Sequence, residues 1–348
     1  MEQPTPPQAP MSPQEALRRV CFLLERGRES SYRVDAFRKA SEAITLIPEE
    51  ELHERVEAGT LKQIKGIGDS SAAIIGQAVR GVLPAYLASV EEKHGAPLTT
   101  AGAELYAALR GDLHAHSNWS DGGSPIEEMV LAAVQLGQEW MALTDHSPRL
   151  TVANGLSRER LADQLRRVEA IDASLGDAFT LLKGIEVDIH LDGTLDQDDD
   201  MLDQLDVVTA SIHSKLRQPA FEMTPRMVAA VRNPRTNVLA HCTGQLVTGS
   251  RGKRPPSQFD AEKVFKACLE HDVAVEINSR PERCDPPDEL IELARDLGCL
   301  FTIDSDAHAP GQLDMKSLGC ERAERLGIPA ERIVTTWPVD EVRAWAKG

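Results

Sequence analysis

The sequence predicts an α/β fold, a barrel of seven parallel strands, preceded by a small all-helical domain. From residue 111 onward, short apolar runs rich in β-branched residues alternate with amphipathic helical patterns, which is typical of βαβ units. Before residue 110, apolar residues recur mainly at helical spacing. A chain of 348 residues with 41% hydrophobic side chains is long enough for one large and one small domain.

The first part of the chain is expected to hold a tail and the helical domain. Residues 1–13 are rich in proline and show no periodicity, so we expect a disordered tail. Residues 14–100 are expected to form the helical domain, whose first helix is indicated by an apolar stripe through Leu17, Val20 and Leu24, with Gly27 as its stop. Residues 101–110 are expected to link it to the domain formed by residues 111–348.

Residues 61–81 predict two helices joined by a tight glycine turn. Leu61 and Ile64 lead into Gly66-Ile67-Gly68, and apolar residues then continue at helical spacing. Glycines allow unusual backbone conformations and leave amide N–H groups accessible at the next helix N-terminus, which suits a phosphate. The stretch resembles the helix-hairpin-helix motif, and residues 32–48 are similar to the N-terminal domain of bacterial family X DNA polymerases. The resemblance implies that Gly66, Ile67 and Gly68 contact the DNA backbone without reading sequence; a purely structural turn is the alternative.

The second part of the chain contains seven segments expected to be strands. Each is a short apolar run, and amphipathic helical patterns lie between them, such as the one that starts with Ser124 as N-cap and Pro125 at the first helical position. The expected strands are residues 111–116, 140–146, 179–189, 206–214, 236–242, 272–279 and 300–308.

Histidines and carboxylates gather at the C-terminal ends of these strands. His114 and His116 are two residues apart, so in a strand both side chains point to the same face. In a barrel of parallel strands all C-terminal ends share one mouth. Six of the ten histidines lie at such places together with three carboxylates, which predicts a metal site. The nine candidate ligands are His114, His116, Asp121, His146, Glu186, His213, His241, Asp306 and His308.

Residues 111–348 resemble the PHP (polymerase and histidinol phosphatase) superfamily of metal-dependent phosphoesterases. Within it, the C-terminal domain of bacterial family X DNA polymerases is most similar, because E-V-D-I-H-x-D-G-T-L-D also occurs here at 186–196. Residues 101–110 leave no room for the nucleotide-transferring domain of those polymerases, so polymerase activity is not expected. The matching motifs are H-x-H at 114–116, S-D-G at 120–122, T-D-H at 144–146, G-I-E-V-D at 184–188, S-I-H-S at 211–214, L-A-H at 239–241 and S-D-A-H at 305–308.

The resemblance implies a trinuclear metal centre in a distorted (β/α)7 barrel. Six imidazoles favour transition metals, so three ions of manganese, zinc or iron are expected rather than magnesium or calcium. Such ions would outweigh three carboxylates and leave a positive cavity suited to a phosphoester. The implied ligand groups are His114, His116, Glu186 and Asp306, which are also the expected catalytic residues; Glu186, His213 and His241; and Asp121, His146 and His308.

These features predict a metal-dependent phosphoesterase that acts on DNA in repair, as a 3'-5' exonuclease, in 3'-end processing or at abasic sites. A small-molecule phosphatase of the histidinol-phosphate type is the alternative, although it leaves the hairpin without a use. A DNA-binding adaptor with purely structural metals is a third hypothesis. The cationic residues just beyond the strand ends that could bind further substrate phosphates are Arg149, Lys215, Arg251, Lys253 and Arg254.

Charge and cysteine content indicate which partners and which cellular compartment to expect. Residues 1–100 carry 12 Lys and Arg against 14 Asp and Glu, and residues 101–348 carry 26 against 41, so −15 of the net charge of −17 lies in the second part. An acidic body attracts nucleic acid poorly, but at physiological salt only charges within about 8 Å of a contact matter much. The six cysteines form no C-x-x-C pair, and no apolar run approaches a membrane span, so we expect a cytoplasmic protein without membrane contact.

Overall fold

The computed structural model describes residues 11–249 and 252–348, which form two compact units, one up to Pro97 and one from Leu98 onward. The expected tail falls mainly on residues 1–10, outside the described residues. Pro13, expected in the tail, instead begins a helix because Ser12 caps it. The Ser12 Oγ accepts a hydrogen bond from the Glu15 N–H (3.2 Å), and the Glu15 carboxylate accepts one from the Ser12 N–H (2.8 Å).

The first unit is helical in its described part. Its core consists of apolar side chains such as Leu17, Leu24, Ile74, Ile75 and Leu87, all of them fully buried or nearly so. These residues lie on helices that pack together, with α1 against α2, α4 and α5. The helices of this unit are α1 (Pro13–Arg26), α2 (Ser31–Ile44), α3 (Glu49–Glu57), α4 (Asp69–Val79) and α5 (Ala85–His94).

The glycine turn lies directly before α4. The segment expected as the first hairpin helix is only a 3-10 turn, Leu61–Gln63, because Gly59 and Gly66 both have positive φ and bracket it closely. Gly66 has a φ of +98°, a conformation that favours glycine. Gly68 is the N-cap of α4, and its N–H donates to the Ser71 Oγ (3.0 Å). The turn between the two elements is therefore formed as expected from the glycines, with one helix shorter than expected.

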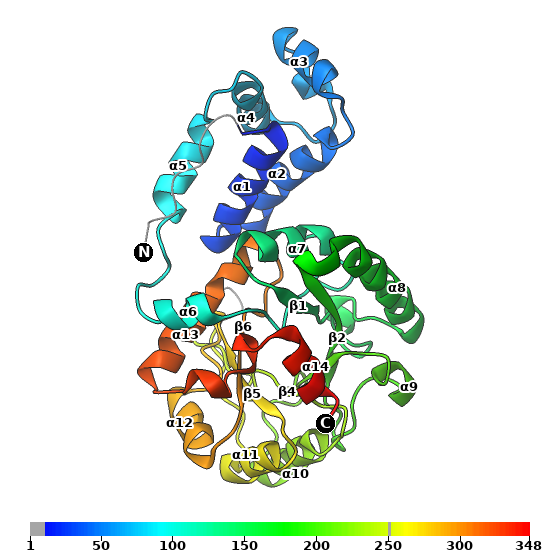
Figure 1. Cartoon of the computed structure of the whole chain (residues 1–348), viewed down its shortest axis with the longest axis vertical. Coiled ribbons are helices and arrows are strands. Elements are labelled where there is room, and N and C mark those ends of the chain that lie inside the picture. Colours follow the sequence, from blue (N-terminus) through cyan, green and yellow to red (C-terminus); the bar gives the residue numbers. More distant parts are fainter. Residues whose placement is uncertain (1–10, 250–251) are drawn as a thin grey trace. The chain divides into compact units, whose positions relative to one another are not determined.

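The second unit is built on a six-stranded parallel sheet whose strands follow one another in chain order. The sheet is curled, so the C-terminal ends of its strands face a common region (Figure 1). Its strand residues are almost all buried, as the apolar runs predicted. The strands are β1 (Trp140–Leu143), β2 (Thr180–Asp188), β3 (Val207–Ser211), β4 (Val238–Leu239), β5 (Ala274–Asn278) and β6 (Phe301–Asp304).

Helices surround this sheet (Figure 1). Helix α6 lies in the segment expected as a linker and packs on α13, and the Tyr106 hydroxyl donates to Asp314 (2.6 Å), which lies just before α13. In the described ranges 11–249 and 252–348, no helix combines the length and apolarity that crossing a membrane requires. The helices of the second unit are α6 (Ala103–Ala108), α7 (Ile126–Gln135), α8 (Arg158–Leu175), α9 (Asp199–Leu202), α10 (Ala220–Val231), α11 (Ala261–Glu270), α12 (Asp288–Leu297), α13 (Lys316–Arg325) and α14 (Val339–Ala346).

The first of the seven expected strands, residues 111–116, is an extended segment and not a regular strand. It makes one isolated parallel bridge, Ala115 to Ala307. Its Asp112 carbonyl accepts a hydrogen bond from Ala142 in β1, and its Ala115 carbonyl accepts one from Thr144, directly after β1. Several backbone N–H groups of this segment donate to side-chain oxygens, so they are not available for pairing with a neighbouring strand. The Leu113 N–H donates to Asp304 (2.8 Å) and the Ala115 N–H to Thr144 (3.0 Å). The segment thus lies between β1 and the end of β6.

Candidate metal centre

The curled sheet brings all nine candidate ligands together. Six of them come directly after or near the end of a strand: His146 after β1, Glu186 in β2, His213 after β3, His241 after β4, and Asp306 and His308 after β6. The extended segment contributes His114, His116 and, in the following turn, Asp121. Neighbouring parallel strands end at one edge, so chain segments far apart in sequence deliver their polar side chains to one place.

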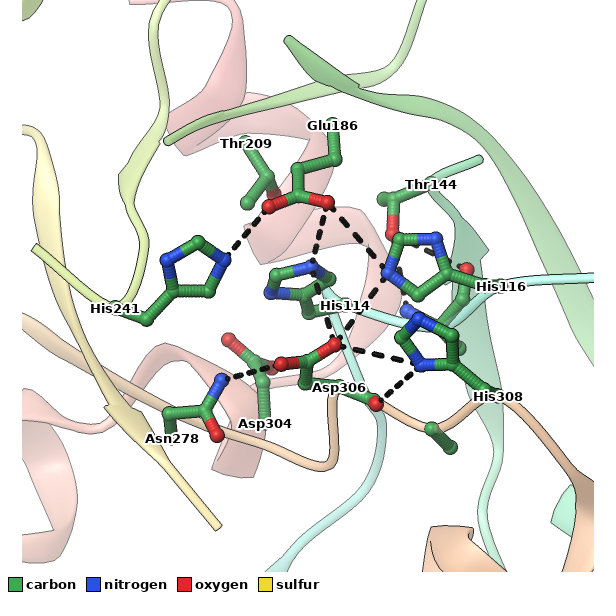
Figure 2. A network of polar contacts seen from close by, with 12 residues as sticks. His114, His116, Thr144, Glu186, Thr209, His241, Asn278, Asp304, Asp306 and His308 are labelled. Carbon is green, nitrogen blue, oxygen red and sulfur yellow. Dashed lines mark hydrogen bonds and ion pairs between the residues drawn. The ribbon is translucent and has the colours of Figure 1, made fainter. Parts of the chain in front are cut away.

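Glu186 lies at the centre of this cluster and is 1% exposed. Its Oε1 is 2.8 Å from the His241 Nε2 and 3.2 Å from the His213 Nε2. Its Oε2 is 2.7 Å from the His146 Nδ1 and 3.4 Å from the His114 Nε2. Figure 2 shows this carboxylate reaching imidazoles on both sides. One carboxylate that contacts so many imidazoles has the arrangement expected of a bridging ligand.

Two aspartates complete the cluster. The Asp306 Oδ1 is 3.5 Å from the His116 Nε2 and 3.9 Å from the His114 Nε2 (Figure 2). The Asp121 Oδ1 is 3.4 Å from the Nε2 atoms of both His146 and His308. Asp306 has a φ of +50°, which is uncommon outside glycine and turns its carboxylate toward the histidines.

The donor atoms form four overlapping groups, each with its atoms within 4.8 Å of one another. The groups differ in part from the grouping that the family resemblance implies. His116 also joins the group around Asp121, and His241 lies with His114 and Asp306. The groups are His116, Asp121, His146 and His308; His114, His241 and Asp306; His114, His116 and Glu186; and His146, Glu186 and His213.

Buried atoms without partners show that these residues fit metal ions. The His114 Nε2, the Glu186 Oε2 and both ring nitrogens of His116 and His213 are buried and have no hydrogen-bond partner. An unpaired buried polar atom costs about 1–3 kcal/mol, so a cluster of them is expected only where another group satisfies them. Imidazole nitrogens and carboxylate oxygens are the donors that divalent transition metals take.

Electrostatic coupling sets the protonation of the cluster. Burial alone would raise the pKa of Glu186, but His146, His114 and His213 outweigh it and hold the pKa well below its ordinary range. Burial, together with the neighbouring His308 and His146, lowers the pKa of His116 to about 3. Carboxylate anions and neutral imidazoles are the forms that bind metals, and Glu186 and His116 are shifted toward them. The pKa of His146 is instead raised to about 10, because Glu186 and Asp121 outweigh its burial.

Two arginines that the sequence reasoning did not single out also reach the cluster. Arg283 donates from Nε to the Asp306 Oδ2 (2.9 Å), and the Arg280 Nη1 lies 3.2 Å from the His308 Nδ1. Burial raises the pKa of Asp306, yet Arg283, His114 and Arg280 more than reverse this and hold it well below its ordinary range. The run R-P-E-R at 280–283, directly after an expected strand, is the signal that could have found them.

The cationic residues predicted to bind phosphate have different surroundings. Arg149 lies near the cluster, with its Nε 3.3 Å from Asp188, whose carboxylate contacts His213. Arg254 donates from Nε to the Gly244 carbonyl (2.5 Å), while Lys215 and Lys253 are exposed. Arg251 lies outside the described residues.

Comparison with known proteins identifies the second unit. The family model described as the PHP domain matches residues 112–280. Residues 112–280 of this chain are a PHP domain. Seven of its nine candidate ligands lie within the matched residues, and Asp306 and His308 lie beyond them.

Two curated relatives and one solved structure are similar to this chain. The DNA polymerase/3'-5' exonuclease PolX of Bacillus subtilis is 37% identical over 239 residues, which are 69% of this chain and 41% of that protein, so the chain spans less than half of that relative. A probable phosphatase of Vibrio parahaemolyticus is 26% identical over 65% of this chain and 88% of its own length. A crystal structure of the histidinol phosphate phosphatase of Lactococcus lactis aligns with 19% identity and a TM-score of 0.47, covering 63% of this chain and 92% of that one.

Both curated relatives have names that refer to phosphoester-hydrolysing enzymes, one an exonuclease and one a probable phosphatase. The domain match agrees with the expectation from the sequence motifs.

Proposed function

We propose that this protein is a metal-dependent phosphoesterase that acts on DNA in repair, removing nucleotides from 3' ends or cutting at abasic sites. The observation that carries the proposal is the combination, in one chain, of the ligand cluster with a glycine turn suited to the DNA backbone. The 37% identity to a protein named DNA polymerase/3'-5' exonuclease supports the same substrate class. We further propose that residues 14–100 are a helix-hairpin-helix domain, that residues 111–348 form the PHP barrel, and that the protein works in the cytoplasm.

In this proposal three divalent ions of manganese, zinc or iron are held by the nine clustered residues. When bound, such ions polarise phosphoryl oxygens and lower the pKa of water toward about 7. The chain itself supplies the charge balance. Three carboxylates with six neutral imidazoles carry about −3, fewer charges than three divalent ions bring, so an anionic phosphoester is attracted.

Arg283 and Arg280 orient the substrate in this proposal. The Arg283 guanidinium is fixed through Nε on Asp306 and is 13% exposed, so it lies beside the cluster without being sealed from solvent. Guanidinium groups bind phosphoryl oxygens with two parallel hydrogen bonds. Arg149 near Asp188 is placed to bind a further phosphate of a nucleic-acid strand.

The glycine turn holds the DNA backbone in this proposal. Gly68 is exposed, and no atom lies within 4 Å of the place where a side chain would begin, so a phosphate can approach the start of α4 closely. Lys62 and Lys65 are exposed beside the turn, and Lys62 neutralises Asp69 across 2.7 Å. Backbone amides at the N-terminus of a helix bind phosphate irrespective of base sequence.

The test is a substrate panel with Mn²⁺: a 3'-labelled oligonucleotide, a duplex with one abasic site, and a small phosphomonoester. We expect the oligonucleotide or the abasic duplex to be cleaved with the higher kcat/KM. DNA that stays intact while the phosphomonoester is hydrolysed rapidly would overturn the DNA assignment. That result would favour the second candidate, a small-molecule phosphatase, which the acidic second part and the coverage of 88% of the Vibrio phosphatase support.

A further inference from the structure

Strand β5 carries none of the nine candidate ligands, yet its side chains contact several of them. Glu276 and Asn278 are two residues apart on β5, so both point to the same face of the sheet. Their exposed fractions are 0% and 1%. Two polar side chains in a buried strand are costly unless their contacts are specific.

Glu276 contacts two candidate ligands that belong to different segments. Its Oε1 is 2.5 Å from the His114 Nδ1, on the side of the ring that faces away from Glu186. Its Oε2 accepts a hydrogen bond from the backbone N–H of His241 (2.6 Å). His241 has a φ of +24°, a conformation that is rare for a residue with a side chain and needs support from its surroundings.

Asn278 connects Glu276 to a third ligand. Its Nδ2 donates to the Glu276 Oε2 (3.1 Å) and to the Asp306 Oδ2 (3.1 Å). Figure 2 shows this amide beside the Asp306 carboxylate. The two inward side chains of β5 therefore support residues from the extended segment, from the end of β4 and from the end of β6.

We propose that Glu276 is a positioning residue that fixes the tautomer of His114 and the backbone of His241, so that both imidazoles present Nε2 to the metal centre. The Glu276 Oε1 lies 2.5 Å from the His114 Nδ1, so the ring N–H at this position donates to the carboxylate. This leaves the opposite ring atom, Nε2, which faces Glu186 and Asp306, as the one that would bind a metal. A carboxylate behind a metal-binding imidazole orients the ring and raises its basicity. This inference rests on the metal-binding role of the site proposed above.

The variant Glu276→Gln separates this role from simple packing because the two side chains have the same shape. The amide has one acceptor oxygen, and the buried His241 N–H requires it, so the NH₂ group faces His114. That group donates to Nδ1 and moves the ring proton to Nε2, which removes the lone pair that a metal needs. We expect the affinity for Zn²⁺, measured by competition with a chelator and without substrate, to fall by about 10–100-fold.

Asp285→Asn is the matched control. Asp285 is also fully buried and accepts hydrogen bonds from the Thr243 N–H, the Thr243 hydroxyl and the Gln245 N–H, but from no candidate ligand. This control is expected to lower thermal stability while Zn²⁺ affinity stays within about twofold of the wild type. Unchanged Zn²⁺ affinity in Glu276→Gln, or an equal loss in both variants, would overturn the proposal.

A measurement on the unaltered full-length protein covers the case in which Glu276→Gln does not fold. With ¹⁵N-labelled histidine and Zn²⁺ bound, the two-bond ¹H–¹⁵N spectrum distinguishes a ring protonated at Nδ1 from one protonated at Nε2. We expect His114, assigned by comparison with His114→Gln, to be the Nδ1–H form. A protonated Nε2 with a free Nδ1 overturns the proposal, and neither experiment depends on which phosphoester the protein hydrolyses.

Discussion

The two units differ in how they treat buried polar atoms. In residues 11–97, no buried side-chain nitrogen or oxygen lacks a hydrogen-bond partner. The described residues from 98 onward contain eighteen such atoms, eight of them on candidate ligands. The first unit has the polar pairing of an ordinary helical core. The second unit contains a costly cluster that only a further group could satisfy. The difference teaches that the cluster suited to metal lies in the second unit, which agrees with the proposal that the first unit contributes only through its surface.

The largest effect that tests this division is expected from His114→Ala. His114 contacts Glu186 and Asp306 and belongs to two of the four donor groups, so its loss weakens both groups. Because metal-based stabilisation of the transition state is worth several kcal/mol, we expect hydrolysis to fall about 10³-fold or more. DNA affinity, measured by fluorescence anisotropy, is expected to stay near the wild-type value. Wild-type hydrolysis in this variant would contradict the ligand assignment.

A smaller effect is expected from Arg283→Met, which tests whether the second unit also binds the substrate phosphate. Loss of a charge-assisted hydrogen bond costs about 1.5–3 kcal/mol, so kcat/KM is expected to fall by about 10–100-fold, mainly through KM. Metal content, measured by mass spectrometry, should not change. Arg295→Met on α12, where Arg295 pairs with Asp296, is the control and keeps the wild-type KM. An unchanged KM in Arg283→Met would remove this residue from the substrate site.

The smallest effect is expected from Gly68→Val, which tests the first unit. Gly68 has a φ of −100° and open space beside its Cα, so valine fits the fold but occupies the place where a phosphate approaches. We expect KM for DNA to rise about tenfold, the equivalent of one or two lost hydrogen bonds, with a reduced salt dependence of binding. Hydrolysis of a phosphomonoester serves as the internal control. Equal losses on both substrates would contradict the division of roles.

The sequence predicts the ligand cluster better than it predicts the backbone that carries it. His146, Glu186 and Asp306 could be placed because a parallel sheet brings strand ends to one edge, whatever the details of pairing. The irregular form of residues 111–116 could not be foreseen, because it depends on Thr144 and Asp304 taking backbone N–H groups from distant segments. Such contacts are long-range in sequence and leave no periodic signal.

Glu276 shows a second limit of sequence reasoning. Glu276 lies within a buried strand and not at its end, so the rule that ligands follow strand ends does not select it. The two polar residues in V-E-I-N could have indicated a functional role, because polar side chains are rare in a buried strand. Arg283 was missed for a related reason, since an arginine in a loop is most often solvated and only its contact with Asp306 distinguishes it.

The extended segment at residues 111–116 has a consequence for the stability of the whole second unit. It lies between β1 and the segment that follows β6. Its His114 contacts Glu186 on β2, and its His116 contacts Asp306, which follows β6. An ion bound by both His116 and Asp306 would connect residues 111–116 to the segment that follows β6. Metal binding and the free energy of unfolding are then thermodynamically linked, so the second unit is expected to resist unfolding less when the metal is absent.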